Sequence, residues 1–221
     1  MSKIGLKQKT KWNDLMYGKH PTPYDHPIAG LIERYRVSTI KNLAQIKPTD
    51  TVLEIGCEGG NLLSLLPPAK KLVGLDISKA ALTQAKKKLG NKAELVHADA
   101  EEIINLGKRE FDVIICSQTL EHVKYPERIM ENIKRLANID TRIVISVPNE
   151  KFILQVKKFL KSISLMKVFM KGIEDHTSEW HIQVFDNNLV KKIVKNNFDI
   201  YKSLKVLNIY LIYLLRKKVS V

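Results

Sequence analysis

The sequence predicts an α/β protein in which helices cover both faces of a doubly wound sheet. Three observations predict it: a strand that runs through a glycine turn into a helix, apolar runs that alternate with helical patterns, and an acid that closes the second run. The turn lies in Thr51-Val-Leu-Glu-Ile-Gly-Cys-Glu-Gly-Gly60, and apolar residues resume with helical spacing at Leu62. Glycine lets the backbone turn tightly and approach a ligand, so this unit predicts a binding site at the strand end.

Short apolar runs predict the strands, and segments with helical spacing separate them. We expect strands at 51–55, 72–76, 93–97, 111–116, 142–147, 198–207 and 209–217. We expect helices at 27–46, 62–66, 78–89, 126–137 and 186–196. The run at 111–116 is almost wholly apolar, which predicts a central strand covered on both faces. In parallel order it would lie beside the first strand, where the strand order reverses.

Composition bounds the class of protein. A length of 221 residues suits one domain, which we take as 1–221. Because the chain has only Cys57 and Cys116, a disulfide framework is not expected, and a reducing cytoplasm fits. No apolar run approaches the ~20 residues of a membrane span. The basic, polar N-terminus does not resemble a secretory signal, so we expect a cytoplasmic protein.

The net charge of +14 favours anionic partners, such as nucleic acid or an anionic membrane surface. A lysine-rich soluble surface explains the same charge. The lysines are spread along the chain, and no cluster of arginine with aromatic residues stands out. We therefore expect RNA to be a less favoured partner than a small molecule.

The glycine turn indicates which nucleotide would bind. It lacks the G-x-G-x-x-G order of a dinucleotide site, and Glu54 and Glu58 make it acidic, which suits a cationic ligand better than a pyrophosphate. The stretch resembles the first motif of the class I S-adenosylmethionine-dependent methyltransferases, which runs acidic-x-Gly-x-Gly-x-Gly. Glu54, Gly56 and Gly60 match that motif, whereas Glu58 replaces the middle glycine. If that position needs a positive φ, glutamate there costs roughly 1–2 kcal/mol.

The resemblance implies a Rossmann-like sheet of seven strands, mostly parallel with the last antiparallel, and S-adenosyl-L-methionine as the cofactor. Asp76 ends the second strand about twenty residues after Gly56, the spacing of a ribose-binding carboxylate. The alternative, that Asp76 caps the next helix, is weaker because Ser78 is the better cap. The resemblance places Ile77 against the adenine face.

Further cofactor residues are expected after the third and fourth strands. Asp99 resembles the acid that binds the adenine amino group in this family; a helix cap is the alternative, and one side chain can serve both purposes. Ala100 and Ser117 complete the set of expected cofactor-binding residues.

The segment Leu120-Glu-His-Val123, the helix after it and a strand ending in Val-Pro-Asn resemble small-molecule methyltransferases related to quinone-biosynthesis enzymes. Glu121 and His122 are the candidate catalytic residues. The ordinary imidazole pKa of about 6.5 suits a general base at neutral pH. The alternative is a structural pair that fixes the loop. Methyl transfer itself needs mainly an acceptor held in line with the methyl group.

A metal site is not expected. Some relatives carry Glu-x-x-Glu-His at this point, which binds a divalent cation, and His176 or His181 could add a ligand. Here Gln118 replaces the first glutamate, and an amide is a weaker ligand for a hard cation.

The remaining segments flank the cofactor-binding core at 48–149. Residues 1–47 form an N-terminal flap and a helix; within them, the aromatic residues and three prolines of 1–30 predict a loop, either an extension or a flap over the cofactor. Residues 150–180 predict an inserted lid, with a basic, apolar helix that packs on the core or contacts an anionic membrane through 150–171. The last helix and strand pair occupy 181–221.

The predicted function is methyl transfer from S-adenosylmethionine to a small or lipid-like acceptor. An RNA methyltransferase is the first alternative: the charge and the histidines near Glu121 favour it, and the replaced glutamate opposes it. The second alternative is a cofactor-binding subunit without catalysis, which only Glu58 supports.

Overall fold

One sheet forms the centre of the protein, in the order β3-β2-β1-β4-β5-β7-β6. The computed structural model describes residues 6–19, 27–102, 106, 109–162 and 181–219. All neighbouring pairs are parallel except those of β7, which is antiparallel to both β5 and β6. The expected doubly wound sheet with an antiparallel last strand is therefore confirmed. The strands are β1 (Thr51–Ile55), β2 (Lys71–Asp76), β3 (Glu94–His97), β4 (Phe111–Ser117), β5 (Ala137–Pro148), β6 (Phe198–Val206) and β7 (Tyr210–Lys217).

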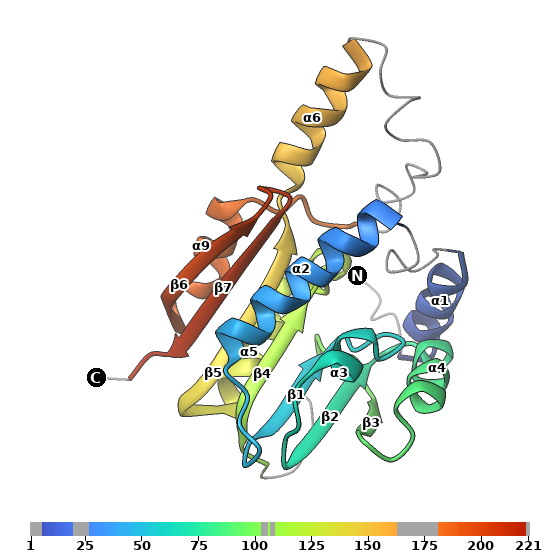
Figure 1. Cartoon of the computed structure of the whole chain (residues 1–221), viewed down its shortest axis with the longest axis vertical. Coiled ribbons are helices and arrows are strands. Elements are labelled where there is room, and N and C mark those ends of the chain that lie inside the picture. The colour runs from blue at the N-terminus through green and yellow to red at the C-terminus, as the bar shows by residue number, and fades with distance from the viewer. Residues whose placement is uncertain (1–5, 20–26, 103–105, 107–108, 163–180, 220–221) are drawn as a thin grey trace.

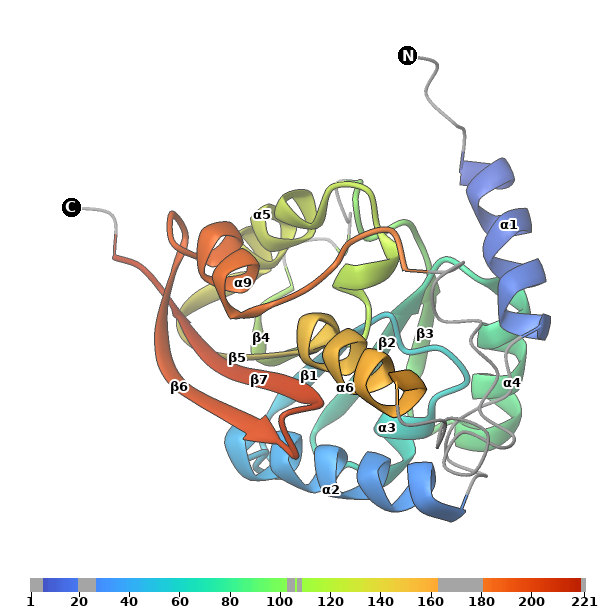
Figure 2. The same ribbon diagram turned by 90° about the horizontal axis from the view of Figure 1, so that it is seen from above.

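Helices cover both faces of this sheet, as predicted. Helices α2 and α3 lie on one face, and α5 and α9 lie on the other (Figures 1 and 2). At the β3 edge, α4 packs against α1. The helices are α1 (Leu6–Lys19), α2 (Pro27–Ala44), α3 (Asn61–Leu65), α4 (Lys79–Leu89), α5 (Pro126–Leu136), α6 (Glu150–Ser162), α9 (Asn187–Val194) and the short 3₁₀ helix η2 (Leu120–His122). None of the helices that the structure describes combines the length and apolar character needed to cross a membrane.

The apolar strand β4 lies at the centre of the sheet because its side chains feed both faces. Ile114 and Cys116 belong to the core cluster that α5 and α9 cover. Val113 and Ile115 point the other way, into the cluster that α2 covers. Successive residues of a strand face opposite sides, so an unbroken apolar run is buried only between two layers of helices.

Local signals fix the ends of the helices near the site. Ser78 caps α4, as expected, because its hydroxyl accepts the Ala81 N–H at 3.0 Å, and Gly90 ends that helix. Asp186 caps α9 through the Leu189 N–H at 2.9 Å. Pro126 opens α5, where its missing N–H costs no hydrogen bond.

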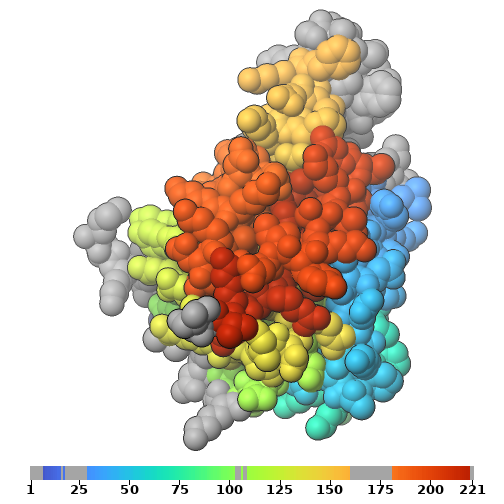
Figure 3. Space-filling model, turned by 90° about the vertical axis from the view of Figure 1, so that its left-hand side faces the viewer, coloured from blue at the N-terminus to red at the C-terminus, as the bar shows by residue number. Residues whose placement is uncertain are grey.

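Three expectations about extent and packing were wrong. Strand β5 begins at Ala137, directly after α5, rather than at residue 142. Residues 6–19, expected as a loop, form helix α1, because the three prolines all lie after it. The expected packing of α6 on the core does not hold for Leu154 and Val156, which are 47% and 37% exposed. Helix α6 instead extends away from the sheet beyond β7 (Figures 1 and 3).

The strand register places the candidate residues along one edge of the sheet. Ile55 of β1 pairs with Leu75 of β2 on one side and with Cys116 of β4 on the other. Asp76 pairs with His97 at the end of β3. The carboxyl ends of four neighbouring strands therefore lie side by side, which is where open parallel sheets bind ligands.

Candidate cofactor and acceptor site

The turn after β1 holds three residues in the left-handed backbone region. Gly56 has a φ of 73° and Gly60 a φ of 74°, and Glu58 between them has a φ of 49°. A side chain at Gly56 would also collide with Thr119. Glu58 therefore carries a strain of about 1–2 kcal/mol that a glycine would avoid. The expected cost of this departure from the motif is present.

Asp76 closes β2, and two backbone donors fix its carboxylate. The Glu58 N–H lies 2.8 Å from Oδ2, and the Ser78 N–H lies 2.8 Å from Oδ1. Burial raises the pKa of Asp76, while the N–H groups of Ser78 and Glu58 lower it. A carboxylate offers about four acceptor positions, so each oxygen can accept a further hydrogen bond. This arrangement suits a ligand with two adjacent hydroxyls.

Asp99 and Ala100 follow β3 and are only 6% and 9% exposed. The Oδ1 atom of Asp99 accepts the Glu101 N–H two residues on at 2.9 Å, in a turn rather than at the start of a described helix. Its Oδ2 atom accepts the Lys9 ammonium at 2.5 Å. Ile77 is half-buried beside these residues, and its carbonyl lies 3.0 Å from His97 Nε2.

Glu54 lies within β1 and is 3% exposed. Its Oε2 atom has no hydrogen-bond partner among the residues that the structure describes. Burial raises the pKa of Glu54 to about 8, and the positive charge of Arg36 opposes that rise. A buried carboxylate oxygen without a partner is costly, so a cationic group of a ligand would satisfy it.

Arg36 of α2 was not predicted, although it lies among the expected residues. It is 4% exposed and donates to the Ser117 hydroxyl and to Glu33, at 2.9 Å from Nε. Tyr210 donates to the other Glu33 oxygen at 2.5 Å. The sequence contains one indication of this role. Glu33 and Arg36 lie on the same face of α2 as the buried residue Ile40. A charged pair on a buried stripe indicates a partner inside the protein.

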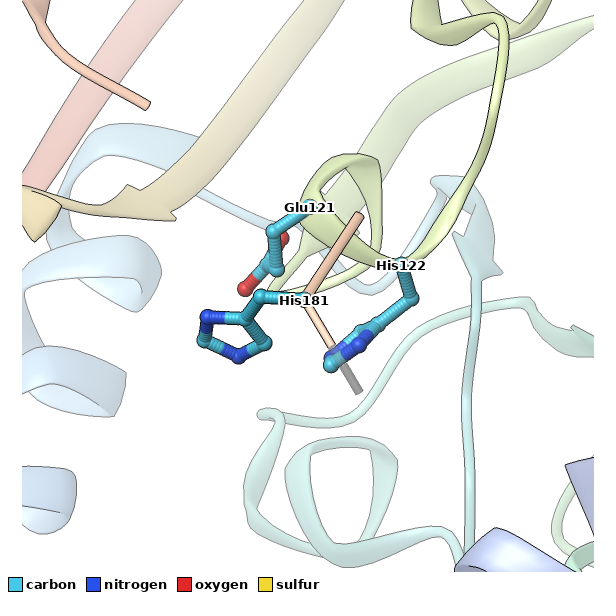
Figure 4. A group of neighbouring side chains, drawn as sticks. All are labelled: Glu121, His122 and His181. Atoms are coloured by element: carbon cyan, nitrogen blue, oxygen red, sulfur yellow. The ribbon is translucent and has the colours of Figure 1, made fainter. Parts of the chain in front are cut away.

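Glu121, His122 and His181 converge at the carboxyl end of β4 (Figure 4). The rings of His122 and His181 lie edge to face, with centroids 4.9 Å apart. Glu121 is 1% exposed, and neither carboxylate oxygen has a hydrogen-bond partner within the described part of the chain. Burial raises the pKa of Glu121 to about 7.

The backbone also connects this group to the segment before α9. The N–H groups of Ile182 and Gln183 donate to the Glu121 carbonyl at 2.8 and 3.2 Å, which holds the segment before α9 over η2. The Glu150 carboxylate bonds Nδ1 of His181 and accepts the Phe185 N–H at 2.8 Å.

Potential ligand atoms of Glu121, His122 and His181 lie within 4.8 Å of one another, a geometry that could hold a divalent cation. Gln118 has a different partner, since its Nε2 donates to the Ser146 hydroxyl at 3.1 Å. His176, the other candidate ligand, lies outside the described residues.

Helix α1 lies over the strand ends that hold the acids. Asp14 accepts the Ser78 hydroxyl at 2.6 Å and the Ala80 N–H at 3.1 Å. A methyl group added at Gly59 would lie 2.6 Å from the Tyr17 hydroxyl, so this ring reaches the glycine turn. Tyr17 is the one aromatic residue of the expected flap that the structure describes at the turn. Lys9 and Asp14 were not predicted, because polar contacts leave no apolar periodicity in α1.

The sheet order, the glycine turn and the acids at consecutive strand ends define a Rossmann-like protein of the class I methyltransferase type. A family model described as a methyltransferase domain matches residues 28–201. The chain belongs to this methyltransferase-domain family.

Curated relatives agree with that assignment. The ubiquinone biosynthesis O-methyltransferase of Aliivibrio fischeri (strain MJ11) is 31% identical over 133 residues, 57% of this chain and 55% of the relative. The protein of the same name from Coxiella burnetii (strain Dugway 5J108-111) is 27% identical over 154 residues, 68% of this chain and 65% of the relative. The chain therefore matches little more than half the length of the first relative.

Solved structures confirm the fold. N-methyltransferase NodS from Bradyrhizobium japonicum WM9, in complex with S-adenosyl-L-homocysteine, has a TM-score of 0.65 at 16% identity and is covered over 97% of both chains. Magnesium protoporphyrin IX methyltransferase from Synechocystis PCC 6803, with bound SAH, has a TM-score of 0.62 at 20% identity, covering 96% of this chain and 95% of that one.

Proposed function

We propose that this chain binds S-adenosylmethionine and transfers its methyl group to a small or lipid-like acceptor. The observation that carries the proposal is the row of acids at neighbouring strand ends, in which Glu54 keeps a buried oxygen without a partner in the described residues. The family, the relatives named as methyltransferases and the structural neighbours that contain S-adenosylhomocysteine support the same cofactor.

The residues fit each part of that cofactor. Asp76 would accept the two ribose hydroxyls, and Asp99 would accept the adenine amino group. Arg36, beside Ser117, would pair with the cofactor carboxylate, since a guanidinium matches a carboxylate in shape and charge. Glu54 would supply negative charge near the ammonium and sulfonium groups, whose positive charge favours the ionised form of this carboxyl.

The cofactor supplies a methyl group that is already activated on a sulfonium. The protein's task is then to position the acceptor, exclude water and remove a proton where the acceptor carries one. We assign proton acceptance to His122. Buried Glu121 would place a negative charge beside the imidazolium that forms.

A hydroxyl acceptor of lipid-like character is supported by two observations. The relatives are named as O-methyltransferases of ubiquinone biosynthesis. Helix α6 extends beyond the sheet with exposed Leu154 and Val156 and with exposed Lys151 and Lys158. Such a surface suits the headgroup region of an anionic bilayer. We place the protein in the cytoplasm, at that surface, where the buried free thiols Cys57 and Cys116 stay reduced.

The experiment that tests this function measures transfer of labelled methyl from S-adenosylmethionine to catechols with and without an isoprenoid tail. Incorporation that is faster with the tailed catechol supports the proposal. Incorporation into RNA alone would favour the RNA methyltransferase. Binding of the cofactor without transfer to any acceptor would favour the subunit without catalysis.

A further inference from the structure

Lys9 forms an ion pair with Asp99, the residue that the proposed function assigns to the adenine amino group. Its ammonium lies 2.5 Å from Asp99 Oδ2 and 3.2 Å from Glu101 Oε2. The Lys9 side chain is 28% exposed, whereas that of Asp99 is 5% exposed. The ion pair is therefore partly buried, and it bridges helix α1 and the end of β3.

Two backbone N–H groups and Lys9 together bond all four oxygens of the two acids. Asp99 Oδ1 accepts the Glu101 N–H at 2.9 Å, and Glu101 Oε1 accepts the Tyr125 N–H at 2.7 Å. Lys9 contacts the remaining oxygen of each carboxylate. Each carboxylate oxygen can accept two hydrogen bonds, so an amino group that reaches Asp99 shares this carboxylate with Lys9.

We propose that Lys9 competes with the adenine amino group for Asp99 and so sets the base selectivity of the cofactor site. This inference rests on the proposed function. Binding of an adenine nucleoside moves the ammonium toward Glu101, which already holds it at 3.2 Å, and replaces an ion pair at Asp99 by a hydrogen bond from a neutral donor. A base with a carbonyl in place of the amino group meets the opposite situation, because that oxygen accepts a hydrogen bond from Lys9.

Charge and anchoring make this competition specific to Lys9. Burial lowers the pKa of Lys9, but Asp99 and Glu101 together raise it above its ordinary value, so the ammonium stays charged. Helix α1 has other attachments. Thr10 Oγ1 lies 3.1 Å from His97 Nε2, and Asp14 bonds the start of α4. Loss of the Lys9 charge therefore leaves the helix attached.

The test compares two probes, S-adenosylhomocysteine and S-inosylhomocysteine, by calorimetry on the full chain. Lys9→Met keeps the length of the side chain and removes its charge. We expect this variant to bind S-adenosylhomocysteine about two- to fivefold more tightly, the range for a partly exposed ion pair. It should bind S-inosylhomocysteine more weakly than the wild type, so that the selectivity for adenine rises.

Two controls separate this role from a structural one. Lys9→Arg should keep the wild-type selectivity for adenine, since arginine keeps a positive charge beside Asp99. Lys11→Met, on the exposed face of the same helix, should change neither affinity. Thermal unfolding of each variant checks the fold.

An unchanged or weaker affinity of Lys9→Met for S-adenosylhomocysteine overturns the competition. An unchanged ratio of the two affinities overturns the selectivity. In both cases the wild type still binds S-adenosylhomocysteine, so the proposed function stands. If the wild type binds neither probe at millimolar concentration, the proposed function and this inference both fall.

Discussion

Glu58 shows how one residue can oppose its local backbone and still lie at a functional turn. Its φ of 49° is a conformation that glycine adopts without strain, and its N–H holds Asp76 at 2.8 Å. Burial, followed by the charge of Asp76, raises the pKa of the Glu58 carboxyl to about 7. Backbone strain and a disfavoured charge both act on this side chain.

Glu58→Gly should therefore stabilise the protein against urea. Relief of about 1–2 kcal/mol of strain is partly offset by roughly 0.5–1 kcal/mol for the greater freedom of glycine in the unfolded chain. Glu58→Ala, which keeps the strain and loses the carboxyl, is the matched control. A lower midpoint for the glycine variant than for the alanine variant would refute the strain. Affinity for S-adenosylhomocysteine should hold or rise, and a large loss would give the carboxyl a role in binding.

His122→Ala tests proton removal at the acceptor end. Turnover should fall by about 10²–10⁴-fold, the usual contribution of a positioned base, while cofactor affinity stays the same. Unchanged turnover would make His122 structural. The assay is repeated with EDTA and with added Mg²⁺. Loss of activity with EDTA that Mg²⁺ restores would replace the base by a cation held among Glu121, His122 and His181.

At the scale of elements, strands and capped helices could be predicted from the sequence because their signals are local. The apolar run of β4 and the cap at Ser78 are examples. Helix α1 could not be predicted, because it is held by polar contacts with residues far along the chain, such as Lys9 with Asp99. The start of β5 was missed because Asn138 and Asp140 are polar, and the Thr141 hydroxyl joins this stretch to the Phe111 carbonyl at 2.8 Å.

Helix α6 should mediate contact with anionic membranes. The double variant Leu154→Ser, Val156→Ser should lower the fraction of protein that sediments with vesicles containing anionic lipid, because the apolar contact is lost. Added salt should lower the wild-type fraction, since screening weakens attraction by lysine. Leu31→Ser, at a residue of α2 that is 63% exposed, is the control. Equal sedimentation of the double variant and the wild type would rule out docking through this helix.

At the scale of the molecule, buried carboxyls link stability to pH. The folded protein holds the proton of Glu54 up to a pKa of about 8, above the ordinary carboxyl value of 4.5. Folding therefore gains stability from this group at low pH, and the gain is lost as pH rises from about 4.5 through 8, because the folded state binds the proton more tightly.

Glu54→Gln isolates that effect from the titration of the rest of the chain. The variant and the wild type should have similar melting temperatures near pH 5, where both side chains are neutral. The variant should melt at a higher temperature than the wild type at pH 8.5. A constant difference between the two proteins across this range would contradict a raised pKa.

The residues of the site that were predicted carry a local pattern, whereas those that were missed have partners far away in the sequence. Each cofactor acid lies within a strand, at its end or two residues after it, so it could be found from a pattern of a few residues. The pairs Arg36 with Ser117, and Glu150 with His181, join segments that only the sheet order brings together. The net charge of +14 does not indicate these pairs, because Arg36 lies inside an acidic site while most lysines are spread along the chain.

The central claim is that the acids at the strand ends bind the nucleoside part of the cofactor. Calorimetric titration of the wild type and of Asp76→Ala with S-adenosylhomocysteine tests it most directly. We predict one site in the wild type and an affinity about 10- to 100-fold lower in the variant, as expected for losing a hydrogen bond to a charged group. No binding by the wild type at millimolar ligand, or equal affinity of the two proteins, would contradict the claim.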